Sequence, residues 1–139
     1  MRVLIILLIV FMFPTEIRHV ELVGDVVKKE EEVIIKPEIV TLTIYSPTSS
    51  QTDSTPHLTA SGFKIDPNDP GKHRIIAVSR DLKRKWKFNT KVRILNAGKY
   101  NGVYTVKDLM NKRHKKRVDV LVSGDTKPIR LRNIKIIKI

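Results

Sequence analysis

Short segments in which apolar and polar residues alternate recur through the chain after residue 40, and they restrict the folds that it can adopt. β-branched residues are frequent in these segments, and turn residues such as Gly98 separate them. One helical pattern, of one or two turns, covers residues 79–85, with Ser79 as N-cap and Asp81 in the first turn. Six or more short strands with little helix predict a mainly β fold, either a small closed barrel or a sandwich. The expected strands are residues 41–45, 74–78, 91–95, 102–107, 116–122 and 134–139.

The first 40 residues have a different composition. An apolar run from Val3 to Phe13 follows Arg2 and is shorter than the roughly 20 residues that span a bilayer. This pattern predicts a signal peptide or membrane anchor over residues 1–14 and a charged linker over residues 15–40. The alternative is a buried strand or helix at the start of the fold. We therefore expect a protein of the cell envelope, exported to the periplasm or cell surface or membrane-tethered, with membrane contact through residues 1–14.

Residues 41–139 are strongly basic, with 22 Lys and Arg but only seven acidic residues, all of them Asp. This charge favours an anionic partner, which can be nucleic acid, anionic lipid or an anionic wall polymer. The basic run over residues 112–117 contains no Phe, Tyr or Trp on which a base could stack, and this argues against nucleic acid. Cysteine is absent and the four histidines are scattered, so we predict no disulfide, no metal site and no cofactor.

Two aspartates stand out as candidates for chemistry. Asp108 ends an expected strand, and Asp119 lies within the next one, on the face opposite Val118 and Val120. A carboxylate fixed on a strand beside a loop can act as a general acid or base. Equally, both acids could simply pair with the neighbouring cations. The small residues 59–62 form a turn that a ligand or a backbone can approach closely.

Six pieces of the sequence occur in an order and spacing that resemble a known family. They are Thr-Ile-Tyr at 43–45, Thr-Ala-Ser-Gly at 59–62, Ile-Ala-Val at 76–78, Phe-Asn-Thr-Lys-Val at 88–92, Tyr-Thr-Val-Lys-Asp at 104–108 and Arg-Val-Asp-Val at 117–120. Together they resemble the 3D (three-aspartate) domain and, more distantly, rare lipoprotein A, expansins and membrane-bound lytic transglycosylase A. The resemblance implies a small six-stranded double-psi β-barrel over residues 41–139.

The chain departs from this family's pattern at two places. After Val78 the family usually has Asp-Pro, whereas residues 79–81 here read Ser-Arg-Asp, with Asp81 as the nearest counterpart of the family's first aspartate. After Asp108 the family usually has Thr-Gly-Gly, and residues 109–111 read Leu-Met-Asn instead. The second difference falls in a loop that shapes the glycan groove of the relatives.

By this resemblance the domain acts on cell-wall glycan as a peptidoglycan lytic transglycosylase. Asp119 would be the acid/base and Asp108 its supporting carboxylate. In that reaction one carboxyl group protonates the glycosidic oxygen and then takes a proton from the muramoyl hydroxyl, which closes an anhydro ring. The partner would be peptidoglycan glycan strands or another anionic wall polymer. Substrate contacts would come from Tyr45, Thr59, Ser61, Gly62, Lys112 and Arg117.

One alternative function and one question about the acidity of Asp119 stay open at the level of sequence. A non-catalytic peptidoglycan-binding or structural module, of bacterial or phage origin, would contain the same pieces. The acid must also be protonated when substrate binds, whereas the cations of residues 112–117 would lower the pKa of a nearby aspartate. Burial of Asp119 and the charge of Asp108 would act in the opposite direction.

Overall fold

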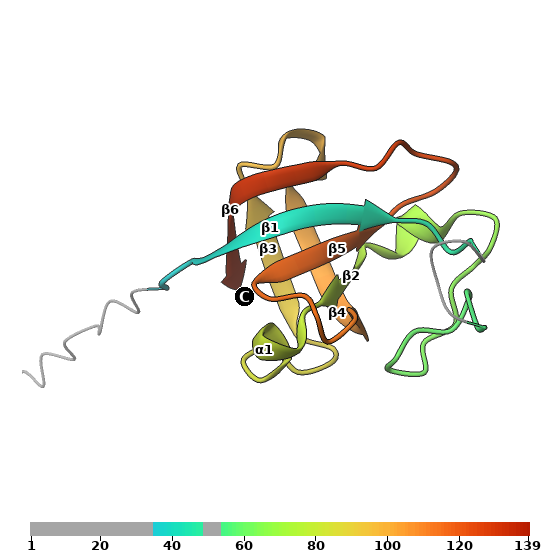
Figure 1. Ribbon diagram of the computed structural model, residues 1–139, viewed down its shortest axis with the longest axis horizontal. Helices are drawn as coiled ribbons and strands as arrows, with labels where there is room; N and C mark the ends of the chain where they lie inside the picture. Colours follow the sequence, from blue (N-terminus) through green and yellow to red (C-terminus); the bar gives the residue numbers. More distant parts are fainter. Residues whose placement is uncertain (1–34, 49–53) are drawn as a thin grey trace, which may run out of the picture. The chain divides into compact units, whose positions relative to one another are not determined.

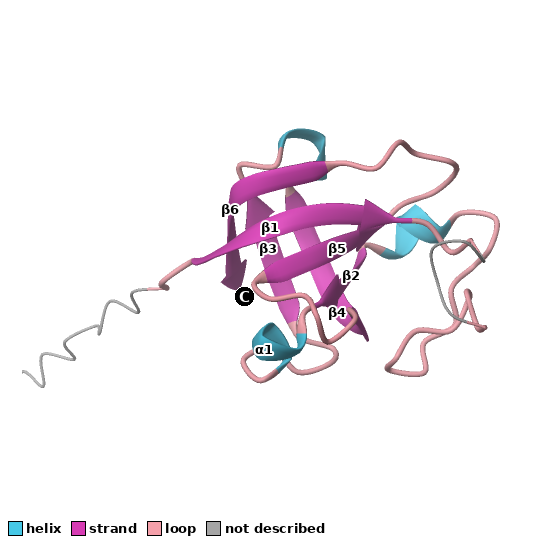
Figure 2. Cartoon of the chain, viewed as in Figure 1, coloured by secondary structure: helices cyan, strands magenta, loops and turns pink. Residues whose placement is uncertain are grey.

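The computed structural model describes residues 35–48 and 54–139, so the expected signal peptide or anchor and residues 15–34 of the expected linker lie outside it. The described residues form six strands, one α-helical turn and two 3-10 turns (Figure 2). None of their helices is long and apolar enough to cross a membrane. The expected mainly β fold with little helix is confirmed. The elements are β1 (Glu38–Tyr45), β2 (Ile75–Val78), α1 (Arg80–Lys83), β3 (Lys91–Leu95), β4 (Gly102–Leu109), β5 (Arg117–Leu121) and β6 (Arg130–Lys138), with 3-10 turns at Pro70–His73 and Gly98–Tyr100.

The six strands close into a barrel in the order β1-β5-β2-β4-β3-β6 (Figure 1). β1 runs parallel to β5 and β2 runs parallel to β4, whereas the other neighbours are antiparallel. β5 therefore lies between β1 and β2, and β2 lies between β4 and β5. The first three strands and the last three thus follow equivalent paths and are woven through each other. This is the double-psi arrangement that the sequence led us to expect.

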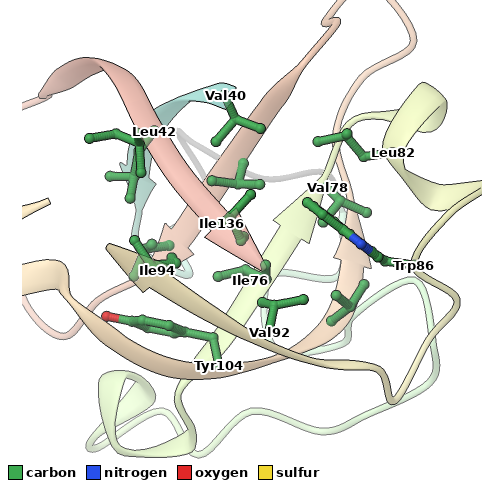
Figure 3. Close-up of a cluster of buried hydrophobic side chains, with 14 of the residues drawn as sticks. Val40, Leu42, Ile76, Val78, Leu82, Trp86, Val92, Ile94, Tyr104 and Ile136 are labelled. Atoms are coloured by element: carbon green, nitrogen blue, oxygen red, sulfur yellow. The ribbon is translucent and has the colours of Figure 1, made fainter. Parts of the chain in front are cut away.

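Alternation along the strands fills the barrel with apolar side chains. In β3, Val92 and Ile94 are buried, whereas Lys91, Arg93 and Leu95 face outward. All six strands contribute to this core, and two residues in and after α1 complete it (Figure 3). The principal core residues are Val40, Leu42, Ile76, Val78, Leu82, Trp86, Val92, Ile94, Tyr104, Val106, Val118, Val120, Ile134 and Ile136.

The N-terminal boundary of the barrel differs from the expected one. β1 begins at Glu38 rather than at residue 41, and Val40 is only 3% exposed within the core. The expected linker is therefore wrong at residues 38–40. The sequence conceals this because Pro37 and a charged stretch precede the strand, and only the pairing of Ile39 with Lys135 of β6 reveals the strand there. β6 likewise begins earlier than residue 134.

A second, smaller apolar cluster lies on the outside of the barrel wall. It joins the outward sides of β1, β2 and β5 to the long connection between β1 and β2, which is green in Figure 1. Because this cluster covers β2, all four residues of that strand are buried. Packing therefore holds part of the connection against the strands that carry the two aspartates. The cluster consists of Tyr45, Ile65, Ile75, Ala77, Met110 and Leu121, with Phe63 against it.

Candidate functional site

The two candidate aspartates lie on strands that flank one small residue. Ala77 of β2 pairs with Asp108 of β4 on one side and with Asp119 of β5 on the other. Thr43 of β1 pairs with Asp119 on its far side. Neighbouring strands are about 4.8 Å apart, so the backbones of the two aspartates are about 10 Å apart. The short side chain of Ala77 leaves space for both carboxylates above it.

A β-bulge in β4 turns Asp108 toward this face. Val106 points into the core, and simple alternation along the strand would point Asp108 the same way. Val106 pairs with Ile76, but the next residue of β2 pairs with Asp108, so β4 contains one extra residue, Lys107. A bulge of this kind re-aims the side chains that follow it. The bulge therefore places Asp108 on the outer face of the wall, where the other aspartate lies.

Asp108 is held in place by three hydrogen bonds. Its Oδ1 accepts from the backbone N–H groups of Ala60 (2.8 Å) and Leu109 (2.9 Å), and its Oδ2 accepts from the Tyr45 hydroxyl (3.2 Å). Burial, and next the charge of Asp108, raise the pKa of the Tyr45 phenol, so it stays protonated and donates. These bonds fix the orientation of Asp108 beside the second carboxylate.

Replacing Tyr45 by Phe is expected to lower the free energy of unfolding by about 1–2 kcal/mol, because the buried contact loses a hydrogen bond to a charged group. Chemical denaturation measures this change. Tyr100→Phe is the matched control, since the Tyr100 hydroxyl has no hydrogen bond with the residues that the structure describes. Equal losses in the two variants would contradict an anchoring role for the Tyr45 hydroxyl.

An open pocket of about 620 Å³ lies against this part of the wall. Both aspartates and Ala77 belong to its lining, together with Tyr45 and residues 58–60 from the connection between β1 and β2. The lining also includes Arg80 at the start of α1, and Arg113 and His114 from the loop between β4 and β5. The pocket therefore combines two carboxylates with two guanidinium groups, a lining suited to a polar ligand that carries negative charge.

Burial is the largest influence on the pKa of Asp119. It raises the pKa of this carboxyl group from its ordinary value of 3.8 to about 6, and the charge of Asp108 acts in the same direction. A hydrogen bond with Thr43 and the charge of Arg117 oppose this change but do not outweigh it. The Oδ1 atom of Asp119 is buried without a hydrogen-bond partner among the described residues. Near neutral pH this group can therefore hold a proton or release one.

The basic loop before β5 brings an uncharged ring into the lining. Nη1 of Arg117 donates a hydrogen bond to Nδ1 of His114 (2.9 Å), because a guanidinium group can only donate. Burial and the charges of Arg117, Arg113 and Arg130 lower the pKa of His114, so its imidazole is neutral at pH 7. Its other ring nitrogen, Nε2, lies 3.4 Å from Nε of Arg113, so the neutral ring of His114 lies between two arginines of the basic loop.

Four of the residues predicted for the site line the pocket, namely Asp108, Asp119, Tyr45 and Thr59. Ser61 and Gly62 lie outside the lining and shape the turn next to it. The Thr59 hydroxyl accepts from the N–H of Phe63 (3.1 Å) and lies 3.0 Å from the Ser61 hydroxyl. Gly62 adopts a φ of +83°, which glycine tolerates best. This turn positions the N–H of Ala60 that binds Asp108.

Lys112 and Arg117 also lie outside the lining. Lys112 is exposed, and Arg117 influences Asp119 through its charge. The sequence-based prediction did not include Arg113 and His114, which line the pocket. Both belong to the basic run of residues 112–117, so the run itself was the signal that could have identified them. The prediction also missed Arg80, for which the sequence carries no local signal, because only the closure of the barrel brings α1 to this pocket.

Asp81, which the sequence resemblance suggested as the nearest counterpart of a family aspartate, is not part of the pocket lining. Its Oδ2 accepts a hydrogen bond from the backbone N–H of Lys116 (2.9 Å). Burial would raise its pKa, but hydrogen bonds from Ser79 and the backbone outweigh burial and lower it. Asp81 therefore connects α1 to the loop before β5.

The described residues contain no cluster of three His, Cys, Asp or Glu that could hold a metal ion. The chain matches no known protein family, no curated protein and no solved structure.

Proposed function

We propose that this barrel is a cell-wall glycan-active domain that cleaves the glycan strands of peptidoglycan as a lytic transglycosylase. The observation that carries the proposal is Asp119, a carboxyl group with a pKa of about 6 in the lining of an open pocket. A general acid is most effective when its pKa lies near the operating pH. An ordinary surface aspartate, with a pKa near 4, would be ionised almost completely at that pH.

In the proposed reaction Asp119 donates its proton to the glycosidic oxygen as the bond from that oxygen to the anomeric carbon breaks. The resulting carboxylate then takes the proton of the muramoyl C6 hydroxyl, whose oxygen attacks the same anomeric carbon and closes the anhydro ring. One carboxyl group thus serves as acid and then as base, whereas a retaining glycosidase needs a second carboxylate as nucleophile. The negative charge of Asp108 stabilises the positive charge that develops on the sugar ring.

The basic residues of the lining fit an anionic glycan. Arg80 and Arg113 line the pocket with the two aspartates, and guanidinium groups bind carboxylates through paired hydrogen bonds. The lactyl and peptide carboxylates of peptidoglycan are groups of this kind. The proposal places the domain outside the cytoplasm, in the cell envelope, as the apolar run within residues 1–14 predicts.

A non-catalytic peptidoglycan-binding module is the second candidate function. The same two guanidinium groups favour it, because they could hold wall carboxylates while the aspartates do no chemistry. The replacement of Thr-Gly-Gly by residues 109–111 also falls at this pocket, since all three residues belong to the lining.

Incubation of the purified full-length protein with peptidoglycan sacculi distinguishes the two candidates. We expect soluble products with anhydromuramoyl ends, each lighter by one water than the product of hydrolysis, as measured by mass spectrometry. Sedimentation with sacculi without any release would reject the enzyme and leave the binding module. Binding that falls equally with salt for sacculi and for DNA would indicate unspecific electrostatic attraction to the basic surface.

A further inference from the structure

The outer surface of β3 and β6 carries cationic and aliphatic side chains in alternation. Arg93 of β3 is flanked by Val103 of β4 on one side and by Ile137 of β6 on the other. The next outward residue of β3, Lys91, accepts a backbone hydrogen bond from Ile139 and so has an aliphatic neighbour as well. Each of these cations therefore lies directly beside an apolar side chain of an adjacent strand.

The same pattern continues where β6 meets β1. Lys135 of β6 is flanked by Leu95 of β3 and by Ile39 of β1. We call this surface the β3–β6 face. It consists of the cations Lys91, Arg93 and Lys135 and the aliphatic residues Ile39, Leu95, Val103, Ile137 and Ile139.

The exposed apolar residues of the described chain concentrate on this face. Single exposed apolar side chains are normal on any protein, but a group of them marks an interaction surface. Of the six large hydrophobic residues that are exposed among the described residues, four belong to the β3–β6 face: Ile39 (46% exposed), Leu95 (37%), Val103 (37%) and Ile139 (51%).

The positive charge of the β3–β6 face is not compensated by nearby acids. The sequence contains no Asp or Glu in residues 82–107 or 126–139, which include all of β3 and β6. Glu38 of β1 pairs with Ile136, an inward residue, and its carboxylate binds Lys85. A second copy of this chain is therefore a poor partner for the face, because a symmetric contact would set cations against cations.

The β3–β6 face lies on the far side of the barrel from the pocket. In the closed order of strands, β3 and β6 are opposite β5 and β2, which carry Asp119 and Ala77. A partner bound to the face would therefore leave the pocket open.

We propose that the β3–β6 face docks the barrel onto the surface of a membrane that contains anionic phospholipids. The three cations match anionic headgroups, and the aliphatic side chains between them enter the boundary between headgroups and acyl chains. A nucleic acid would offer bases to stack, but the face contains no aromatic residue. An anionic wall polymer would match the cations but would offer no apolar phase to the exposed aliphatic residues.

A fluorescent label at a single cysteine tests this orientation on the full chain. The protein has no cysteine of its own, so Leu95→Cys and Asn68→Cys each give one labelling site for an environment-sensitive dye. Asn68 is exposed in the connection between β1 and β2, away from the β3–β6 face. With vesicles of phosphatidylglycerol and phosphatidylcholine, we expect a blue shift and increased intensity for the label at 95 and little change for the label at 68. Equal responses at both positions, or none at 95, would overturn the proposal.

A charge-reversal variant of the face completes the test. The triple change Lys91→Glu, Arg93→Glu and Lys135→Glu should weaken the vesicle response of the label at 95 by at least about a hundredfold, at about fivefold per cation removed, because each glutamate also adds a repelled negative charge. The matched control reverses three exposed lysines elsewhere, at positions 64, 115 and 127, with the same change in net charge. Equal weakening by both triples would show that net charge alone drives binding and would reject the face. Loss of DNA binding in the first triple without any vesicle response in the wild type would make nucleic acid the partner instead.

Discussion

Asp119→Asn is expected to slow the release of glycan fragments from sacculi by about a thousandfold, because an amide can neither donate nor accept the proton of the cleavage step. The readout is the rate at which anhydromuramoyl products appear. Asp125→Asn is the matched control, since Asp125 is exposed in the loop between β5 and β6 and lies outside the pocket lining. Activity in Asp119→Asn within a few fold of the wild type would remove Asp119 from the reaction. In the wild type, the rate should fall as the pH rises through about 6, because Asp119 then loses its proton.

The same variant is expected to be more stable than the wild type at pH 7. The pKa of Asp119 is raised from 3.8 to about 6 on folding, so the folded state binds this proton more tightly than the unfolded state. The contribution of Asp119 to stability is therefore fully present below about pH 4 and is lost as the pH rises through about 6. An amide avoids this cost, and we expect a gain of about 3 kcal/mol at pH 7 that disappears at pH 4. A loss of stability at pH 7 would indicate instead that Asp119 forms a structural ion pair.

Leu42→Ala is expected to lower the free energy of unfolding by about 3 kcal/mol and the Tm by roughly 15 °C. Leu42 is fully buried in the barrel, at the place where β1 meets both β5 and β6 (Figure 3). The neighbouring strands cannot collapse into the space, because their hydrogen bonds fix them around a closed ring. Thermal and chemical denaturation measure the change.

Leu95→Ala makes the same chemical change on the outside of the barrel and serves as the control. Leu95 is 37% exposed, so its truncation should cost about 1 kcal/mol or less. Similar losses at the two positions would mean that the interior is not packed around Leu42 as described.

The strands were the most predictable part of this molecule. In residues 91–94, the alternation of charged and aliphatic residues predicted a half-buried strand, and the burial of Val92 and Ile94 confirms it. The same rule correctly placed Asp119 opposite Val118 and Val120. Alternation is a local property, and the sequence therefore contains it directly.

Alternation along the strand could not predict the orientation of Asp108. By alternation it shares a face with Val106 and would enter the core, and only the pairing with β2 reveals the extra residue at position 107. The start of β1 at Glu38 depends in the same way on β6, which lies almost at the other end of the chain. The acidity of Asp119 was undecided at the level of sequence, because it depends on how far burial exceeds the opposing charge of Arg117.

The interwoven path of the two halves has a consequence for synthesis. β1 and β3 both require β6 as a neighbour, and β6 is made after all the others. While the chain is still growing, two edges of the sheet remain without partners and the barrel cannot close. Such long-range pairings also make closure slow. A nascent chain of this kind cannot complete its barrel until its last strand emerges, and until then the unpaired edges of β1 and β3 are open to pairing with other chains.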